Sequence, residues 1–264
     1  MRFLTSLYLL YLLTPIILLF VGSFGETWVN ELLPTGITLR WYLDLWDDPS
    51  FSRAFWVSLK VCFATCSLVT VLALPMAYAL YMGRSAYLKT ITRVISLLPI
   101  AAPPLVLGFG FILLFSTDTL PWLGSTWLLI AGHVVLTLPY MLQTLVSDFR
   151  HLGIGQLESA SESLGATWWQ GFYQIVVPCL RHSLATGLIM VAALSIGEFQ
   201  LSNLIAGFLN RNYPVVLLQA FYGATGFACA ATVALLLLAT LAACAGSVTS
   251  AMAHAQLGGQ SKGR

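Results

Sequence analysis

An acidic side chain inside an apolar stretch has few chemical roles open to it, and Glu198 is such a side chain. It falls in the predicted membrane span Leu184–Ile205, where a carboxylate costs several kcal/mol unless it faces water or a partner. Gln200 follows it, and Asn203 lies one turn plus one residue farther on, so that Glu198 and Asn203 can face one cavity. We predict that Glu198, Gln200 and Asn203 line a translocation path. The alternative is that Glu198 only hydrogen-bonds a neighbouring helix.

Other residues that could do chemistry are sparse. His133 stands alone in the predicted span Trp127–Val146, where a hydrogen-bonded packing role is commoner than a ligand or proton relay. The sequence contains no H-E-x-x-H or G-x-S-x-G motif and no pair of aspartates within a span, so we predict no catalytic site and no enzyme activity. The cysteines lie within or beside apolar runs without zinc-ligand spacing, which predicts no metal site.

The composition indicates a membrane protein. Hydrophobic residues make up 58% of the 264 residues and charged residues 8%, whereas soluble domains carry about 25% charged residues. The net charge of +2 includes no basic stripe of the kind that follows nucleic-acid phosphates. Nucleic acid is therefore not an expected partner, and the lipid bilayer is.

Six apolar runs are long enough to cross a hydrocarbon core, which needs about 20 residues. They are Phe3–Phe24, Ala54–Met82, Ile95–Phe115, Trp127–Val146, Leu184–Ile205 and Phe227–Val248. The first run has only Arg2 before it and no A-x-A site after it, which favours a retained helix over a signal peptide. We predict an all-α, polytopic membrane protein that forms a single transmembrane domain over residues 1–264.

The distribution of basic residues predicts the orientation, because cytoplasmic loops retain Lys and Arg. With the N-terminus inside, the cytoplasmic segments contain Arg2, Arg84, Lys89, Arg93, Arg150, Arg181, Lys262 and Arg264. The outer side receives mainly Arg40, Arg53 and Arg211. Both termini are therefore expected in the cytoplasm.

Prolines interrupt several spans, namely Pro75, Pro99, Pro103, Pro104 and Pro139. Each removes a backbone donor, and within a bilayer the freed carbonyls need neighbouring helices, hydroxyls or water. Broken helices are compatible with a translocation path, and a kink that improves packing is the alternative for any one proline.

The longest connection predicted on the cytoplasmic side, Ser147–Arg181, has the pattern of a helix-turn-helix. Ser159–Leu164 is compatible with a helix, Gly165 can supply a left-handed stop, and Thr167 with Gln170 forms a T-x-x-Q capping box for a second helix that Pro178 ends. Leu157, Ala160 and Leu164 are spaced to present one apolar edge. Such an elbow is suited to docking a partner.

This elbow resembles the EAA loop of binding-protein-dependent ABC permeases, E-A-A, three residues, Gly, nine residues, I-x-L-P. Ser159-Ala160-Ser161 occupies the EAA place, Gly165 the glycine, Ile175 the isoleucine and Val177-Pro178 the closing pair. Ser159 replaces the usual acid, with Glu158 one position earlier and Glu162 three later, and Ser161 and Val177 replace alanine and leucine. The resemblance implies that the loop at about 150–180 couples to an ATPase through Glu158, Ser159, Ala160, Glu162, Leu164, Gly165, Ala166, Ile175 and Pro178.

Three further stretches, LPTGITLRWY (33–42), LPIAAPPLVLG (98–108) and SIGEF (195–199), are similar to the polyamine, aminoethylphosphonate and ferric-ion branch of type I importer permeases. The resemblance implies a permease subunit in a bacterial inner membrane that translocates a small polar solute. A polyamine such as spermidine or putrescine is favoured, because Glu198 suits a cation. An aminoethylphosphonate or ferric-type solute is the alternative.

The resemblance also implies partners. The chain has no G-x-x-x-x-G-K-[ST] phosphate loop, so ATP and Mg²⁺ are expected on a separate cytoplasmic subunit, present in two copies, and no cofactor on this chain. A second permease, either a paralogue or another copy, should complete the pathway, and a periplasmic binding protein should deliver the solute.

Two rival hypotheses belong to other classes. A secondary transporter usually shows inverted repeats and paired intramembrane carboxylates, whereas Glu198 has no such pair and no internal repeat is evident. A membrane-embedded enzyme has no motif in its favour. Co-purification of a nucleotide-binding subunit would separate the three hypotheses.

Overall fold

The computed structural model describes residues 2–28, 31, 33–83, 85–237 and 239–240. Helices dominate this part of the chain, and it contains no β-strand beyond two isolated bridges. The residues form two compact units, one from Met1–Phe51 with Leu217–Arg264 and one from Ser52–Val216. The all-α prediction is confirmed.

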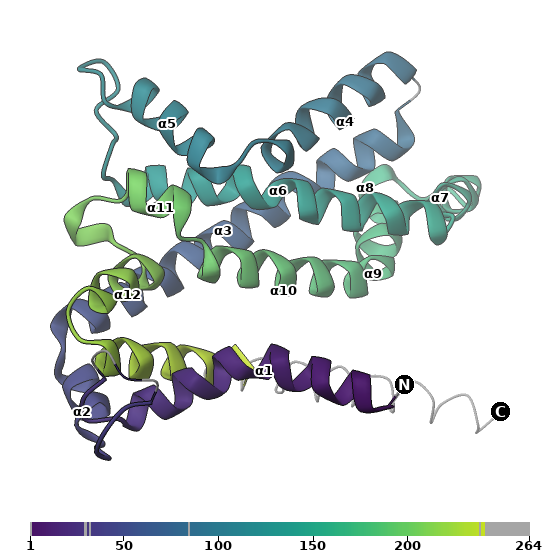
Figure 1. Ribbon diagram of the computed structural model, residues 1–264. Helices are drawn as coiled ribbons and strands as arrows, with labels where there is room; N and C mark the ends of the chain where they lie inside the picture. The colour runs from purple at the N-terminus through teal and green to yellow at the C-terminus, as the bar shows by residue number, and fades with distance from the viewer. Residues whose placement is uncertain (1, 29–30, 32, 84, 238, 241–264) are drawn as a thin grey trace. The chain divides into compact units, whose positions relative to one another are not determined.

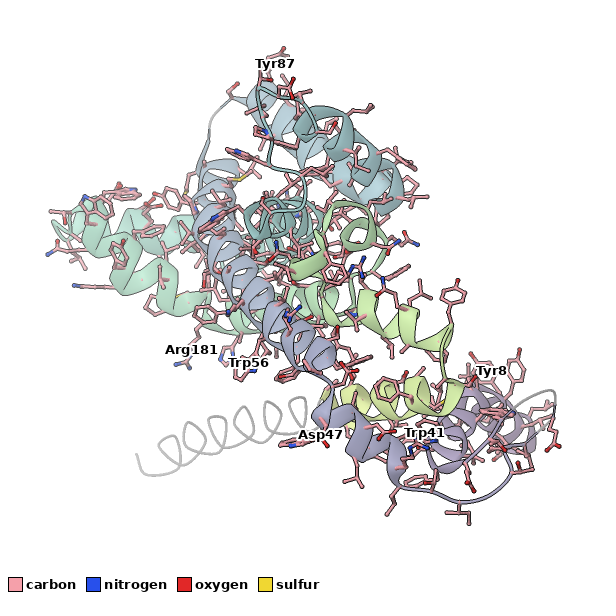
Figure 2. All side chains as sticks on the ribbon, turned by 90° about the vertical axis from the view of Figure 1, so that its left-hand side faces the viewer. Tyr8, Trp41, Asp47, Trp56, Tyr87 and Arg181 are labelled. Carbon is pink, nitrogen blue, oxygen red and sulfur yellow. The ribbon has the colours of Figure 1, made fainter. Side chains whose placement is uncertain are left out.

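The first unit contains α1 (Arg2–Phe24), α2 (Arg40–Asp47) and an apolar helix, Thr225–Leu237. The indole Nε1 of Trp41 donates to the Gly25 carbonyl at 2.7 Å, and the Tyr42 hydroxyl lies 2.8 Å from Ser23 Oγ. These bonds fasten α2 to the end of α1. Figure 2 labels Trp41 and Asp47 at either end of α2.

The second unit is built around α6 (Thr126–His151), which packs along α10 (Arg181–Gly197) (Figure 1). α3 (Pro49–Met82) begins in the first unit and continues into this one. Fully buried side chains from the three helices, among them Val69, Met141, Phe149 and Val191, form its core. Burial of these apolar side chains stabilises the unit.

Two predicted spans are not continuous helices. The third, predicted over Ile95–Phe115, consists of α4 (Ala86–Ala101) and α5 (Pro104–Phe115), whose axes differ by 102°. Pro103 and Pro104 explain the break, because proline ends the hydrogen-bond ladder and disfavours a helical conformation in the preceding residue.

The fifth, predicted over Leu184–Ile205, begins at Arg181 and stops at Gly197. α11 (Gln200–Ile205) follows after two residues, and Glu198 has extended backbone angles. Placing Glu198 inside a continuous helix was therefore wrong. The 3₁₀ turn η2 (Phe208–Asn210) and α12 (Tyr213–Phe221) come next.

Among the residues that the structure describes, three helices are long and apolar enough to cross a membrane, namely Leu4–Phe24, Pro49–Met82 and Thr126–His151. Two bent pairs raise the number to as many as five if each is one span, Thr90–Ala101 with Pro104–Phe115 and Trp168–Cys179 with Arg181–Gly197. Thr225–Leu237 covers most of the described part of the predicted sixth span Phe227–Val248. Residues 238 and 241–248 of that span, with Lys262 and Arg264, lie outside the described residues.

The predicted elbow between α6 and α10 consists of four short elements. They are α7 (Ile154–Ser163), α8 (Trp168–Gly171), the π-helical η1 (Phe172–Val176) and α9 (Val177–Cys179). The first helix is longer than Ser159–Leu164, since it begins at Ile154. The second continues one residue past Pro178, and the chain then bends by 63° into α10.

Candidate functional site

A cavity of about 450 Å³ lies where the two helix breaks of the second unit meet. The α4–α5 break and the α10–α11 break contribute its walls, together with one face of α6. Its lining is Pro99, Ile100, Ala102, Pro104, His133, Leu136, Thr137, Tyr140, Leu194, Ser195, Gly197, Glu198, Phe199 and Gln200. Glu198 is the one carboxylate among these lining residues, and His133 is the one basic side chain.

Glu198 both ends α10 and caps α11. Its Oε1 accepts from the backbone N–H of Leu201 at 2.8 Å, and its Oε2 accepts from the backbone N–H of Ser202 at 2.9 Å. The Ser202 hydroxyl also donates to Oε2. The carboxylate therefore satisfies orphan donors at the start of α11, as an acidic cap does.

His133 links the two sides of this break. Its Nδ1 lies 2.8 Å from Ser195 Oγ on α10, and its Nε2 lies 3.0 Å from Ser202 Oγ on α11. The imidazole is almost completely buried, with 1% of its surface exposed, and its Nε2 is 3.8 Å from Glu198 Oε2. The predicted packing role agrees with these contacts.

The hydrogen bonds around Ser202 determine which groups of this cluster donate and which accept. The Ser202 hydroxyl proton goes to Glu198, so Ser202 Oγ accepts from His133 Nε2–H and from Asn212 Nδ2–H, the latter at 2.9 Å. In a neutral imidazole, Nδ1 then accepts from the Ser195 hydroxyl. Asn212 also donates to the Glu198 carbonyl at 2.8 Å. The cluster thus fixes α10, α11 and α6 to one another.

Only two of the three predicted pathway residues lie at the cavity. Glu198 and Gln200 line the cavity, whereas Asn203 is exposed and does not belong to its lining. The break after Gly197 changes the helical register, so the spacing of five residues does not place Glu198 and Asn203 on one face.

Thr137 and Tyr140 line the cavity and were not singled out from the sequence. They follow His133 at four and seven residues, so the helical period of α6 could have found them. Asn212 lies in the segment between η2 and α12, where no periodicity signals its role.

The turn of the elbow has the geometry that the sequence predicts. Gly165 has φ +84°, its N–H donates to the Glu162 carbonyl at 2.9 Å, and the Ala166 N–H donates to the Ser161 carbonyl at 3.0 Å. These two bonds form a Schellman motif. The Thr167–Gln170 capping box that begins α8 is also present.

The predicted coupling residues divide between two faces of the elbow. Glu158 is buried with 8% of its surface exposed, and Ala166 and Ile175 are half-buried. The others are exposed, namely Ser159, Ala160, Glu162, Leu164, Gly165 and Pro178. Arg181, labelled in Figure 2, begins α10 directly after the elbow and is exposed as well.

The outward face of the elbow is apolar and aromatic. Leu164 is 89% exposed and Trp169 61% exposed, and the rings of Trp169 and Tyr173 stack at 5.7 Å. Exposed apolar groups at this density mark an interaction surface. Among the residues that the structure describes, no group of three or more His, Cys, Asp or Glu side chains is placed to hold a metal ion.

Comparison with known proteins points to membrane transport. Residues 69–248 match the family model described as binding-protein-dependent transport system inner membrane component. The chain is 27% identical over 210 residues to the spermidine/putrescine transport system permease protein PotC of Escherichia coli K12, covering 78% of this chain and 75% of PotC. It is 24% identical over 192 residues to PhnV of Salmonella paratyphi A, named for a 2-aminoethylphosphonate transport system, covering 73% and 71%.

Two solved structures share the fold. One is a chain of a bacterial ABC transporter that imports the acidic polysaccharide alginate, with a TM-score of 0.66 at 17% identity, covering 91% of both chains. The other comes from an alginate ABC transporter in complex with an alginate pentasaccharide-bound periplasmic protein. Its TM-score is 0.73 at 16% identity, covering 94% of this chain and 92% of that one.

Proposed function

Because the chain belongs to the family of binding-protein-dependent transport system inner membrane components, we propose that it carries a small polar solute, preferably a polyamine, through its cavity. Members of this family are permeases of ABC importers in the inner membrane, and not enzymes. The observation that carries the proposal is the cavity at the junction of two helix breaks. Helix breaks expose backbone polar groups, which a membrane protein tolerates where they line a cavity.

The charge of the cavity supports a cationic solute. Glu198 carries the acidic charge of the lining, and Tyr140, Thr137 and Gln200 add polar groups. An aromatic ring and a carboxylate together suit an organic ammonium group. Spermidine or putrescine is the favoured solute, in agreement with the name of PotC, and an aminoethylphosphonate or ferric-type solute is the alternative.

The elbow supports energy supply by a separate subunit. The family is part of ABC importers and implies ATPase and binding-protein partners. We propose that the exposed face of the elbow docks on a cytoplasmic ATPase present in two copies, which binds ATP and Mg²⁺. A second permease, either a paralogue or another copy, completes the path, and a periplasmic binding protein delivers the solute. Both termini then lie in the cytoplasm.

The test is to replace Glu198 and follow uptake of radiolabelled spermidine. Glu198→Gln removes the charge and keeps one of the two oxygens that accept from α11, so we expect at least a tenfold loss of uptake, corresponding to about 1.4 kcal/mol. Glu198→Asp retains the charge and should keep more uptake than Glu198→Gln. The amount of assembled complex and its basal ATP hydrolysis should stay near wild type in both.

Uptake of aminoethylphosphonate, the alternative solute, is measured with the same variants for comparison with uptake of spermidine. If the Glu198→Gln complex takes up spermidine like wild type, or if it fails to assemble, the pathway role of Glu198 is wrong. A chain that co-purifies with no ATP-hydrolysing subunit would contradict the importer function itself.

A further inference from the structure

A single hydroxyl group joins three elements at the inner side of the elbow. The Tyr78 hydroxyl, near the end of α3, donates to Glu158 Oε1 on α7. The oxygen of the Tyr78 hydroxyl also accepts from the indole Nε1–H of Trp168 on α8 at 2.8 Å. We call Tyr78, Glu158 and Trp168 the brace.

Aromatic packing fixes the position of that hydroxyl. The Tyr78 ring contacts Trp168 and Phe172 edge to face, with centroids 5.8 and 5.6 Å apart. On its other side it contacts Phe149 of α6 at 6.3 Å, and Phe149 is fully buried. Edge-to-face pairs at these distances are favourable, so the ring is held by three elements at once.

Glu158 lies on the face of α7 that is turned toward the rest of the chain. Ile154, Glu158 and Ser161 are the buried residues of α7, and they are spaced at four and three residues along one side. The Ser161 hydroxyl donates to the Glu158 carbonyl at 2.8 Å, which adds to the order of this side. Ala160, Glu162 and Leu164 are exposed. A partner that approaches the exposed side meets Glu162 and Leu164, whereas Glu158 is already occupied.

We propose that Glu158 is a positioning residue that fastens the elbow to α3 through Tyr78, and that the exposed residues Glu162 and Leu164, not Glu158, meet the ATPase. The inference rests on the proposed function only in naming the ATPase as the partner. With the brace formed, displacement of the elbow is carried to α3 as well as to α6 and α10, to which the elbow is joined along the chain. With it broken, the elbow can move relative to α3.

The chemistry of the pair gives a test that separates positioning from direct contact. Glu158→Gln keeps an oxygen that can accept from the Tyr78 hydroxyl, whereas Glu158→Ala removes the acceptor. Tyr78→Phe removes the donor and leaves a buried carboxylate short of one partner, which is more costly than losing both partners together. Tyr87→Phe on α4 is the matched control, because Tyr87 is exposed and lies outside the brace (Figure 2).

The variants are compared in nanodiscs by two measurements. Hydrogen–deuterium exchange of the amides at 157–171 reports opening of the elbow and needs no ATPase or solute. Binding of the purified ATPase at graded salt concentrations reports charged contacts, because exposed ion pairs weaken with ionic strength.

We expect roughly tenfold faster exchange at the elbow in Glu158→Ala and Tyr78→Phe, the size associated with losing a partner of a buried polar group. Glu158→Gln and Tyr87→Phe should exchange like wild type, and the double variant Tyr78→Phe/Glu158→Ala should be no faster than the single variants. The salt dependence of ATPase binding should be unchanged in Glu158→Gln and reduced in Glu162→Gln.

Two outcomes would overturn the brace. One is exchange at wild-type rates in Tyr78→Phe, and the other is a salt dependence of ATPase binding that falls in Glu158→Gln as much as in Glu162→Gln. A wild-type chain that binds no ATPase would contradict the proposed function instead, while the exchange measurement would still decide whether the brace exists.

Discussion

At the scale of single residues, the chain holds the Glu198 carboxylate mainly through hydrogen bonds from backbone and hydroxyl groups. Glu198 receives its hydrogen bonds from two backbone N–H groups and one hydroxyl. Hydrogen bonds of this kind replace those that water would make to the carboxylate. The carboxylate can therefore border a solute path without a permanent counter-ion.

His133 is predicted to hold the α10–α11 break in place. His133→Leu removes a partner from both Ser195 and Ser202 in a buried site, so we expect a loss of stability of about 1–3 kcal/mol. Thermal unfolding of the purified complex in detergent measures it. Hydrogen exchange should rise first in α11, because its Ser202 loses a partner.

His133→Gln provides the comparison, since its amide can both donate and accept and should retain part of the stability. Equal unfolding temperatures for His133→Leu and wild type would show that the two serines do not depend on this ring. An equal loss in both variants would show that ring packing, rather than hydrogen bonding, is the main contribution.

Sequence patterns at this scale predicted which residues are unusual but not what they contact. Glu198 and His133 stand out because a polar group in an apolar run is costly. Their shared partner Ser202, and Asn212, which donates to Ser202 and to the Glu198 carbonyl, lie in ordinary polar positions, and only the folded chain brings them to the same place. Glu158 and Glu162 likewise look equivalent in the sequence, and the burial of one depends on Tyr78, 80 residues away.

At the scale of elements, two glycines perform different tasks. Gly165 has φ +84° and open space around the position of a Cβ atom, so its constraint is in the backbone. Gly187 on α10 is helical, and an added Cβ would approach Met141 Sδ to 2.3 Å, so its constraint is steric. Replacement by valine should therefore have different effects at the two positions.

Gly165→Val should uncouple the complex while leaving the protein expressed and inserted. A β-branched residue in the left-handed region costs about 1–3 kcal/mol, and the strain falls on the Schellman turn between α7 and α8. We expect loss of binding-protein-stimulated ATP hydrolysis, measured on the reconstituted complex. Stimulated turnover at the wild-type rate would remove the elbow from the mechanism.

Gly187→Val is the matched control within the same unit. Overpacking against the fully buried Met141 should cost about 1–3 kcal/mol and lower the yield of folded protein. Size-exclusion profiles of the fluorescently tagged chain would measure that yield. A normal yield with lost coupling would contradict the distinction between the two glycines.

Local signals predicted the elements well where the stabilising contacts are local. The Gly165 turn and the Thr167–Gln170 capping box depend on residues within a few positions of one another, and both are present. The stop at Gly197 was not predicted, because SIGEF contains no proline, although the bonds by which Glu198 caps α11 span only three and four residues. The π-helical turn Phe172–Val176 was also not foreseen.

At the scale of the whole molecule, hydropathy predicted a helical membrane protein correctly, since the need to satisfy backbone groups in lipid leaves few other solutions. Spans counted from apolar runs cannot show which runs are bent. Runs three and five are interrupted, and these two interruptions border the cavity.

The orientation remains a prediction that single-cysteine labelling can test. In a chain without its native cysteines, a cysteine at Asp47 or Asp118 should react with an impermeant maleimide from outside the cell. A cysteine at Ser159 should react only after the inner membrane is opened. All three positions are exposed, so poor reactivity would not come from burial. Labelling of a cysteine at position 159 from outside the cell would show that the predicted orientation is wrong.

The cap on α11 has a consequence for how the chain is made. The groups that donate to the Glu198 carboxylate, at Leu201 and Ser202, follow it in the sequence, and Asn212 follows them. During synthesis from the N-terminus, the acid therefore leaves the ribosome before the residues that stabilise it. The acid therefore reaches its final environment only after the chain as far as Asn212 has been made and has folded back.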